Sequence, residues 1–191
     1  MKRALIFALM LAACQDEVAQ NTTPLPLTPD TVGHFCQMNL LEHDGPKGQV
    51  HLEGLPGAPL FFSQVSDLVV YLHLPEQSHK VLAVYVSDMG ANGATWAEPG
   101  AANWTDATTA HFVIGSSVVG GMGAAEAVPF ANLADARAFA DARGGAVMAL
   151  ADIPKDTFNP PVATMDTEDD DYDRRLNVLT NDASLHQPAT E

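Results

Sequence analysis

The chain has 191 residues, 47% of them hydrophobic, and a formal net charge of −15 that results from 24 Asp and Glu against 9 Lys and Arg. So little basic charge excludes a nucleic-acid-binding surface and the polybasic patches that bind anionic lipids. The hydrophobic content is that of a globular protein. We therefore expect a folded body whose acidity attracts cations or a basic partner surface.

The N-terminus has the pattern of a bacterial export signal. Positive charge in Met1-Lys2-Arg3 precedes an apolar stretch over 4–13 that is too short to span a bilayer as a helix. The run Leu11-Ala12-Ala13-Cys14 also resembles a lipoprotein processing box, in which the leader is cut before a cysteine that then carries lipid. We therefore expect a signal peptide over 1–13 and a stable lipid anchor on Cys14. The alternative is an ordinary cleaved signal that leaves Cys14 without a role.

The next segment has the composition of a linker. Residues 14–31 contain Pro24, Pro26 and Pro29 among several threonines, so we expect a lipidated, flexible tether that holds the body off the membrane. Gln15 follows the cysteine, and the absence of an acidic residue there favours the outer membrane.

The C-terminal segment mirrors this linker. Residues 156–191 include nine acidic residues and have little apolar surface to bury, so we expect a disordered tail. Its simplest role is solubility, and the alternative is docking or metal collection. The folded body is then expected over 32–155.

The body contains a weak internal repeat. Residues 62–71 and 130–139 share the pattern Phe-x-Gln/Asn-Val/Leu-x-Asp-x-x-x-aromatic at an offset of 68 residues. Each copy places apolar residues on one face at helical spacing, and Ser63 or Asn132 would suit a helix N-cap. The pattern therefore predicts two equivalent helices, with chance similarity as the alternative.

Strand-like segments flank both predicted helices. In the first copy they are residues 49–52, 59–61 and 81–86, and in the second they are residues 111–115, 127–129 and 146–150. Each half therefore has the order strand, strand, helix, strand. We expect an α+β protein made of two ββαβ units, over 32–95 and 96–155.

Cys36 is the candidate centre of a metal site. If Cys14 carries lipid, Cys36 is the only thiol left in an exported protein, where an unpaired cysteine usually has a purpose. Met38 lies two residues further on, and an extended backbone would put both sulfurs on one face. Thiolate and thioether are soft donors that favour monovalent copper. The alternative is that both side chains only fill the core.

Met122 is a candidate third sulfur donor. It lies in Gly120-Gly121-Met122-Gly123, in the hairpin loop of the second copy, and the first copy has no such loop. The glycines let the backbone bend and bring Met122 to another surface. A loop folded over Cys36 and Met38 would complete a three-sulfur site with an open side for an acceptor. The alternative is an exposed hairpin tip without a special role.

Other possible donors are weaker candidates. His34 and His43 are the histidines closest to Cys36 in the sequence, and Met89 is a spare thioether whose simplest role is packing. Enzyme signatures are absent: the chain has no Gly-x-Ser-x-Gly, His-Glu-x-x-His, phosphate-binding glycine loop or Cys-x-x-Cys. A single thiol also cannot run a dithiol redox cycle by itself. We therefore expect a protein that is not an enzyme.

Several runs of the chain together resemble the NosL family, the lipoprotein accessory factors of nitrous oxide reductase. The runs are Phe35-Cys36-Gln37-Met38-Asn39-Leu40, Glu42-His43-Asp44-Gly45-Pro46-Lys47-Gly48-Gln49, Tyr85-Val86-Ser87-Asp88-Met89-Gly90, and the segments around Gly120-Gly121-Met122-Gly123 and Glu126-Ala127-Val128-Pro129-Phe130. The resemblance covers residues 31–155 and the leader, and it leaves the tail out.

This resemblance implies a periplasmic copper(I) chaperone of denitrifying bacteria. Such a protein supplies copper for the copper–sulfide centre of nitrous oxide reductase, with an ABC-type membrane complex and the apo-reductase as partners. It implies a fold of two similar ββαβ units related to organomercurial lyase. It also implies that Cys36, Met38 and Met122 are the copper ligands, and that His43 completes the site or holds a second metal such as zinc. Many members have Cys-Gly-Met where this chain has Gln37 between the sulfurs.

Two other functions stay open from the sequence. One is an enzyme of the organomercurial-lyase type, which the single free thiol disfavours. The other is a lipoprotein that docks to the membrane complex without carrying metal.

Overall fold

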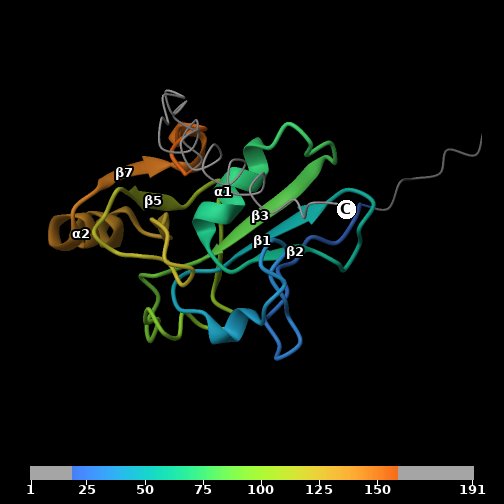
Figure 1. Ribbon diagram of the computed structural model, residues 1–191, viewed down its shortest axis with the longest axis horizontal. Helices are drawn as coiled ribbons and strands as arrows, with labels where there is room; N and C mark the ends of the chain where they lie inside the picture. The colour runs from blue at the N-terminus through green and yellow to red at the C-terminus, as the bar shows by residue number, and fades with distance from the viewer. Residues whose placement is uncertain (1–18, 159–191) are drawn as a thin grey trace, which may run out of the picture. The chain divides into compact units, whose positions relative to one another are not determined.

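The computed structural model describes residues 19–158, which form two antiparallel sheets, each with its own α-helix (Figure 1). The first unit consists of β1 (Gly48–Leu52), β2 (Leu60–Phe62), α1 (Val65–His73) and β3 (Val81–Ser87). The second consists of β5 (His111–Ile114), β6 (Val128–Phe130), α2 (Leu133–Arg143) and β7 (Ala146–Ala149). This order confirms the predicted α+β class with two ββαβ units.

The strand register shows how far the two units correspond. In each sheet the first strand of the unit is central, since β1 pairs with β2 and β3, and β5 pairs with β6 and β7. Phe62 at the end of β2 lies opposite Gly48, and Phe130 at the end of β6 lies opposite His111. The two phenylalanines of the sequence repeat therefore occupy equivalent positions, each at the end of a strand.

The helices begin later than the sequence pattern predicts. They start at Val65 and Leu133, because the residues around Phe62 and Phe130 pair as strands first. Asn132 is the N-cap of α2 as expected, but Gln64 takes this position in α1 in place of Ser63. Helix α1 ends before Leu74-Pro75, because a residue before proline avoids the helical conformation. Helix α2 ends at Arg143, and the residue that caps it, Gly144, has a φ of 76° that suits glycine.

One strand was not expected from the sequence. β4 (Trp104–Asp106) pairs with β3 and completes a first sheet with the order β2-β1-β3-β4, beside a second sheet with the order β6-β5-β7. This strand comes from the range 96–155 that the sequence assigned to the second unit. Its three residues have no diagnostic alternation, and only the edge of β3 makes them a strand.

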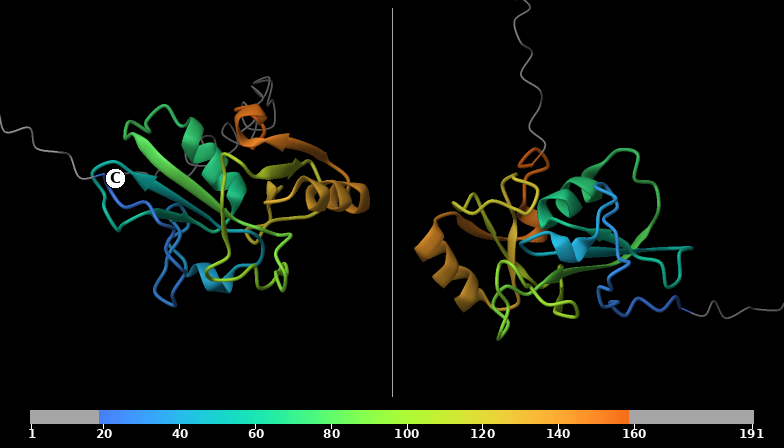
Figure 2. Two further views of the ribbon diagram at one scale, coloured as in Figure 1. Left: turned by 180° about the vertical axis from the view of Figure 1, so that it is seen from behind. Right: turned by 60° about the horizontal axis from the view of Figure 1, so that its bottom comes forward.

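The main hydrophobic core contains residues of both units. Val50, Leu68 and Val86 from the first unit belong to the same buried cluster as Phe112 and Ala127 from the second. A smaller cluster under α2 contains Val113, Val128, Phe130 and Ala136. Helix α2 lies at the end of the second unit away from α1 in all three ribbon views (Figure 2). The two units therefore share one core, at the junction that also carries the candidate site.

The described part of the N-terminal segment contacts this body. The amide of Gln49 bonds both backbone groups of Leu25, at 3.0 Å each. Leu27 is buried, and its N–H donates to the carbonyl of Ala101 at 2.8 Å. Residues 19–31, which the sequence analysis included in the flexible tether, therefore contact the body, because the buried amide of Gln49 and the carbonyl of Ala101 bind their backbone. The tail over 156–191 lies outside the described residues from position 159 onward.

Two short 3₁₀ helices complete the description, η1 (Leu40–Glu42) and η2 (Leu150–Asp152). Within residues 19–158 the helices are too short or too polar to cross a bilayer.

Candidate metal site

Cys36 lies beside the start of helix α1. Its Sγ is 3.5 Å from the Oγ of Ser63, and the thiol is half-buried. Gly33 makes room for it, because a Cβ at that position would lie 2.5 Å from the sulfur. Cys36 is the only free cysteine among the described residues. The thiol is therefore held against the protein surface and stays partly accessible.

The backbone between the two sulfurs of Cys36-Gln37-Met38 is a turn. The N–H of Gly33 donates to the carbonyl of Met38 at 3.0 Å, and Gln37 has a φ of 55°. The backbone is therefore not extended here, and alternation does not place the two sulfurs on one face. The reason is local, since a bridge between Val32 and Asn39 closes this segment into a tight loop.

Gln37 takes the left-handed conformation that glycine adopts without strain. Many members of the family that the sequence resembles have glycine there, which agrees with this geometry. The side chain of Gln37 offsets part of the strain, because its Nε2 donates to the carbonyls of His34 at 2.7 Å and Gly33 at 3.2 Å. The substitution therefore keeps the turn.

Met122 approaches the same end of α1 from the second unit. Its backbone N–H donates to the Oε1 of Gln64 at 3.0 Å, and Gln64 is the residue next to Ser63. Gly121 in this loop lies against the first unit, because a Cβ there would be 2.5 Å from the carbonyl oxygen of Asp44. Cys36 and Met122, far apart in the sequence, are thus attached to two consecutive residues.

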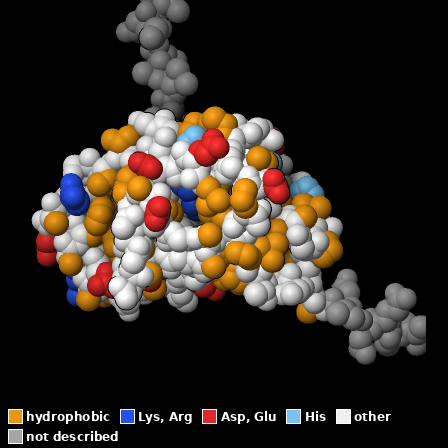
Figure 3. Space-filling view, turned by 90° about the horizontal axis from the view of Figure 1, so that it is seen from below, with side chains coloured by type: hydrophobic (Ala, Val, Ile, Leu, Met, Phe, Trp, Pro, Cys, Tyr) orange, Lys and Arg blue, Asp and Glu red, His pale blue; other side chains and the backbone are white. Residues whose placement is uncertain are grey.

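Both thioethers remain accessible. Met38 is 41% exposed and Met122 is 42% exposed, whereas most methionines of a folded protein serve as packing. Figure 3 shows the underside of the molecule in Figure 1, where apolar and acidic side chains share the surface and basic ones are sparse. Other exposed apolar side chains of the turn and its flanks are Val32, Phe35 and Leu41.

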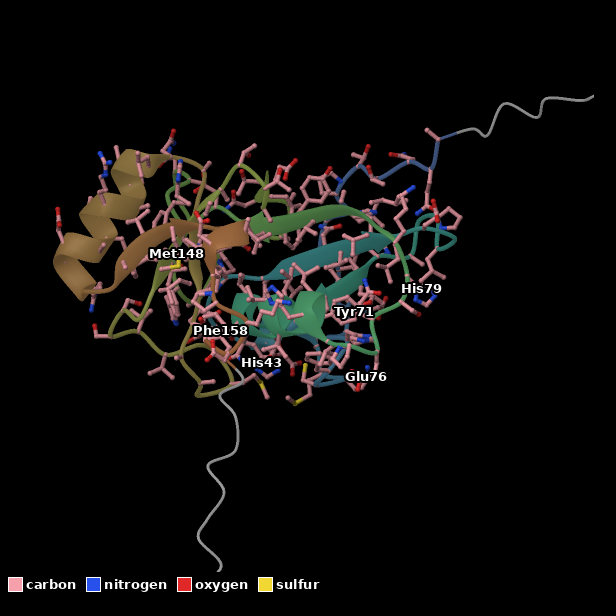
Figure 4. All side chains as sticks on the ribbon, turned by 90° about the horizontal axis from the view of Figure 1, so that it is seen from above. His43, Tyr71, Glu76, His79, Met148 and Phe158 are labelled. Atoms are coloured by element: carbon pink, nitrogen blue, oxygen red, sulfur yellow. The ribbon has the colours of Figure 1, made fainter. Side chains whose placement is uncertain are left out.

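His43 lies beside the methionine loop. The Cβ of His43 would be 3.2 Å from a Cβ on Gly121, and the Nε2 of His43 is buried without a hydrogen-bond partner. Figure 4 labels His43 at an edge of the body where sulfur atoms are also drawn. Its side chain lines a hollow of about 300 Å³ together with Lys47, Glu98 and the leucines at 27, 40 and 41. A nitrogen donor is therefore available next to the loop.

The other two candidates are engaged elsewhere. The ring of His34 packs edge-on against Phe62 and Tyr71, with ring centroids 5.8 and 5.4 Å apart. Met89 packs against the smaller core under α2. Within residues 19–158 there is no group of three or more His, Cys, Asp or Glu side chains that could hold a metal.

Lys47 fastens the segments under the site and was missed from the sequence. It is only 1% exposed, and its Nζ donates to the backbone carbonyls of His43 (2.6 Å), Asp44 (3.0 Å), Gly45 (2.7 Å) and Ser63 (3.3 Å). Burial lowers the pKa of Lys47 to about 8, and the neighbouring acidic groups of Glu126, Asp44 and Cys36 oppose this shift. The ammonium group thus ties the His43 segment to the residue that touches Cys36.

Glu126 is the second buried polar residue at this junction. Its Oε1 accepts hydrogen bonds from the N–H groups of Ser66 (2.8 Å) and Ala127 (2.9 Å), and its Oε2 has no partner. Burial raises the pKa of Glu126 to about 8, although these two bonds oppose the rise, so the side chain is mostly neutral at pH 7. It connects the second unit to the first turn of α1.

These four polar residues, Lys47, Ser63, Gln64 and Glu126, could have been suspected from the sequence in part. Lys47 and Glu126 stand in the runs on which the family resemblance rests, shortly before the strands β1 and β6. Ser63 and Gln64 looked like ordinary helix-start residues. Ser63 contacts Cys36 and Lys47 from distant parts of its own unit, and Gln64 contacts Met122 of the other unit, which the sequence does not reveal.

Comparison with known proteins gives a consistent picture. The NosL family model matches residues 24–158. The copper-binding lipoprotein NosL of Achromobacter cycloclastes is 52% identical over 177 residues, which is 91% of each chain. The copper-binding lipoprotein NosL of Stutzerimonas stutzeri is 33% identical over 153 residues, which covers 78% of this chain and 77% of the relative.

A solved structure also matches. The crystal structure of the copper chaperone NosL from Shewanella denitrificans superposes with a TM-score of 0.64 at 31% identity, over 71% of this chain and 98% of the other. The names of these relatives describe copper binding and a chaperone rather than an enzyme, in agreement with the expectation from the sequence.

Proposed function

The chain belongs to the NosL family, and from this premise we propose that it binds one copper(I) ion through Cys36, Met38 and Met122 and passes it to an acceptor protein. The observation that carries the proposal is the attachment of Cys36 and Met122 to the consecutive residues Ser63 and Gln64. Two exposed thioethers and one thiolate are a donor set that suits monovalent copper.

Transfer would proceed by ligand exchange. The thiolate of Cys36 supplies negative charge to the ion, and the thioethers of Met38 and Met122 are weak neutral donors. Their exposure of 41% and 42% leaves them free to swing away when an acceptor ligand binds. The acidic charge of the chain favours the approach of a cation.

The proposed cellular role follows the family. Processing at Cys14, which lies outside the described residues, would anchor the protein by lipid at the periplasmic face of a membrane, with the outer membrane favoured by Gln15. We propose that it delivers copper for the copper–sulfide centre of nitrous oxide reductase in a denitrifying bacterium. Its partners would be an ABC-type membrane assembly complex and the apo-reductase.

His43 has a secondary place in this proposal. Its unpartnered Nε2 beside Gly121 is a nitrogen donor that could complete the copper site or bind a second metal such as zinc. Nitrogen from imidazole suits zinc as well as copper, so the donor alone does not choose between them.

The test begins with the unmodified protein isolated without oxygen. Copper(I) is titrated in competition with a chromophoric copper(I) chelator such as bicinchoninate, and we expect one tightly bound ion per chain. A protein that stays copper-free under these conditions would contradict the chaperone function and favour a docking lipoprotein that carries no metal.

Substitutions then assign the ligands. We expect Cys36→Ser to abolish competition with the chelator, and Met38→Leu combined with Met122→Leu to weaken binding by roughly tenfold or more, because soft donors are lost. Met148→Leu is the matched control, since Met148 packs against the main core from β7. If the double substitution leaves the affinity at the wild-type value while Cys36→Ser abolishes binding, Cys36 is a ligand and the two methionines are not.

A further inference from the structure

Gln64 joins the methionine loop of one unit to the helix of the other. It is buried at the N-cap of α1, where its Oε1 accepts the N–H of Met122 at 3.0 Å and its Nε2 donates to the Oδ2 of Asp67 at 3.4 Å. Both the oxygen and the nitrogen of this amide form hydrogen bonds, which fix its orientation with the oxygen toward Met122. This oxygen is the only hydrogen-bond partner of the Met122 backbone N–H among the described residues.

The loop is shaped to reach this oxygen. A Cβ on Gly120 would collide with the Oε1 of Gln64 and would lie 2.8 Å from the Oε2 of Glu126. A Cβ on Gly121 would likewise lie 2.5 Å from the carbonyl oxygen of Asp44. Two glycines thus allow the loop to lie directly on the first unit, and Gln64 supplies the directional contact at that interface.

The residues on either side of Gln64 are themselves held in place. The carbonyl of Ser63 accepts a hydrogen bond from the buried ammonium of Lys47, and the N–H of Ser66 donates to Glu126. Ser63 is also the residue that contacts the Sγ of Cys36. Cys36 contacts the side chain of Ser63, and the backbone of Met122 is bonded to the side chain of Gln64, the next residue. The positions of Cys36 and Met122 are therefore linked through two consecutive residues.

We propose that Gln64 is a positioning residue of the copper site, which holds the Met122 backbone where its thioether reaches the ion bound to Cys36. This inference rests on the proposed function. A methionine side chain has three rotatable bonds, so its sulfur covers a wide volume unless the backbone is anchored. Partners that orient metal ligands typically change metal affinity by about 10–100-fold when removed. Gln64 itself does not touch the metal.

The experiment uses Gln64→Leu, which removes the amide and keeps a similar volume, and Gln64→Glu, which keeps an oxygen acceptor for the Met122 N–H. Copper(I) affinity is measured with the same competing chelator. We expect roughly tenfold weaker binding for Gln64→Leu and a much smaller loss for Gln64→Glu. In a chain that already carries Met122→Leu, we expect Gln64→Leu to have no further effect, because the ligand that it positions is gone.

Asn132→Leu is the matched control. Asn132 occupies the position of Gln64 in the second unit of the repeat, is also a helix N-cap without a side-chain capping bond, and is exposed. We expect it to leave copper(I) affinity unchanged, which separates an effect on the methionine loop from a general effect on a helix start.

A second measurement is independent of copper. In the metal-free protein, the amide proton of Met122 should exchange with solvent faster in Gln64→Leu than in the wild type, while amide protons in the middle of α1 keep their rates. Faster exchange throughout α1 would indicate damage to the helix and would overturn the positioning role.

The outcomes separate this inference from the function on which it rests. If the wild type binds copper(I) and Gln64→Leu binds equally well, or weakens binding just as much in the Met122→Leu background, the positioning role is wrong and the chaperone function stands. If the wild type binds no copper(I), both are wrong.

Discussion

Lys47 is the residue whose role depends most on its surroundings. A buried lysine is costly unless its charge is compensated, and here four backbone carbonyls surround the ammonium. An ammonium group has three protons, so these acceptors must share them. The carbonyls belong to the His43–Gly45 segment and to Ser63, the two parts of the first unit that face Met122 and Cys36. The residue therefore stabilises both sides of the candidate site together.

The role of Lys47 predicts a large effect on stability. Lys47→Met keeps most of the side-chain length but leaves buried carbonyls without a donor, which should lower the free energy of unfolding by about 2–4 kcal/mol. Urea denaturation followed by circular dichroism measures this. The control is Lys80→Met, since Lys80 forms only an exposed ion pair with Glu53 at 3.1 Å, and we expect a loss below about 1 kcal/mol. Equal effects for the two lysines would argue against the structural role of Lys47.

The turn over residues 33–38 is the element that holds two of the three sulfurs. Its conformation requires a left-handed residue at position 37 and close approach at Gly33. Sequence spacing alone left the backbone open, because an extended segment would also place residues two apart on one face. The bridge between Val32 and Asn39 and the hydrogen bonds of Gln37 decide for the turn instead.

Position 37 offers a test of this element that changes no donor atom. Gln37→Val places a β-branched residue at a φ of 55°, which should cost about 1–3 kcal/mol and displace Cys36 or Met38, so copper(I) affinity should fall. Gln37→Gly suits the same φ and should keep the affinity close to that of the wild type. Chelator competition on both variants measures the effect. Undiminished binding by Gln37→Val would mean that the turn does not set the positions of the sulfurs.

The molecule as a whole places the candidate site where its two units share a core. Glu126 of the second unit bonds the first turn of α1, and Gln64 of the first unit bonds the loop of the second. The site therefore exists only when both units are folded against each other. A described N-terminal segment bound along the body, through Gln49 and Leu27, adds to the same assembly.

The buried carboxyl of Glu126 gives this assembly a pH dependence. Its pKa is raised from 4.5 to about 8 in the folded protein, so between these values the folded state keeps a proton that the unfolded state has lost. The contribution of Glu126 to stability is therefore full below about pH 4.5 and is lost as pH rises toward about 8. The upper limit of this loss is about 5 kcal/mol, because one pKa unit corresponds to about 1.4 kcal/mol.

Glu126→Gln provides the measurement. Glutamine keeps an oxygen for the N–H groups of Ser66 and Ala127 but does not ionise. We expect the wild type to lose stability relative to this variant between about pH 5 and 8 in urea denaturation, since only the wild type must retain a buried proton. If the difference between the two proteins does not change with pH, Glu126 has an ordinary pKa in the folded state.

The amino-acid sequence alone determined the fold class, the order of elements within each ββαβ unit and the candidate sulfur donors. It could do so because these depend on local features: the repeat around Phe62 and Phe130, the spacing of apolar residues, and the rarity of cysteine and glycine-flanked methionine. It did not predict strand β4, the contacts of residues 19–31 with the body, or the turn at Gln37. Each of these depends on a partner distant in sequence or on a backbone angle that residue spacing does not specify.

Only the tertiary structure decided that Cys36 and the backbone of Met122 contact neighbouring residues at the start of α1. Lys47 and Glu126 stand in runs that resemble the family, yet their structural roles depend on backbone carbonyls and amides from other segments. The attachment of Met122 to Gln64 likewise crosses from one unit to the other, and the contact of Cys36 with Ser63 joins two distant segments of the first unit. Sequence patterns describe the faces of helices and strands, whereas a site formed at the junction of two units depends on how those faces pack. For that reason the sequence indicated which atoms could bind a metal, and the packing of the two units determined which residues hold them.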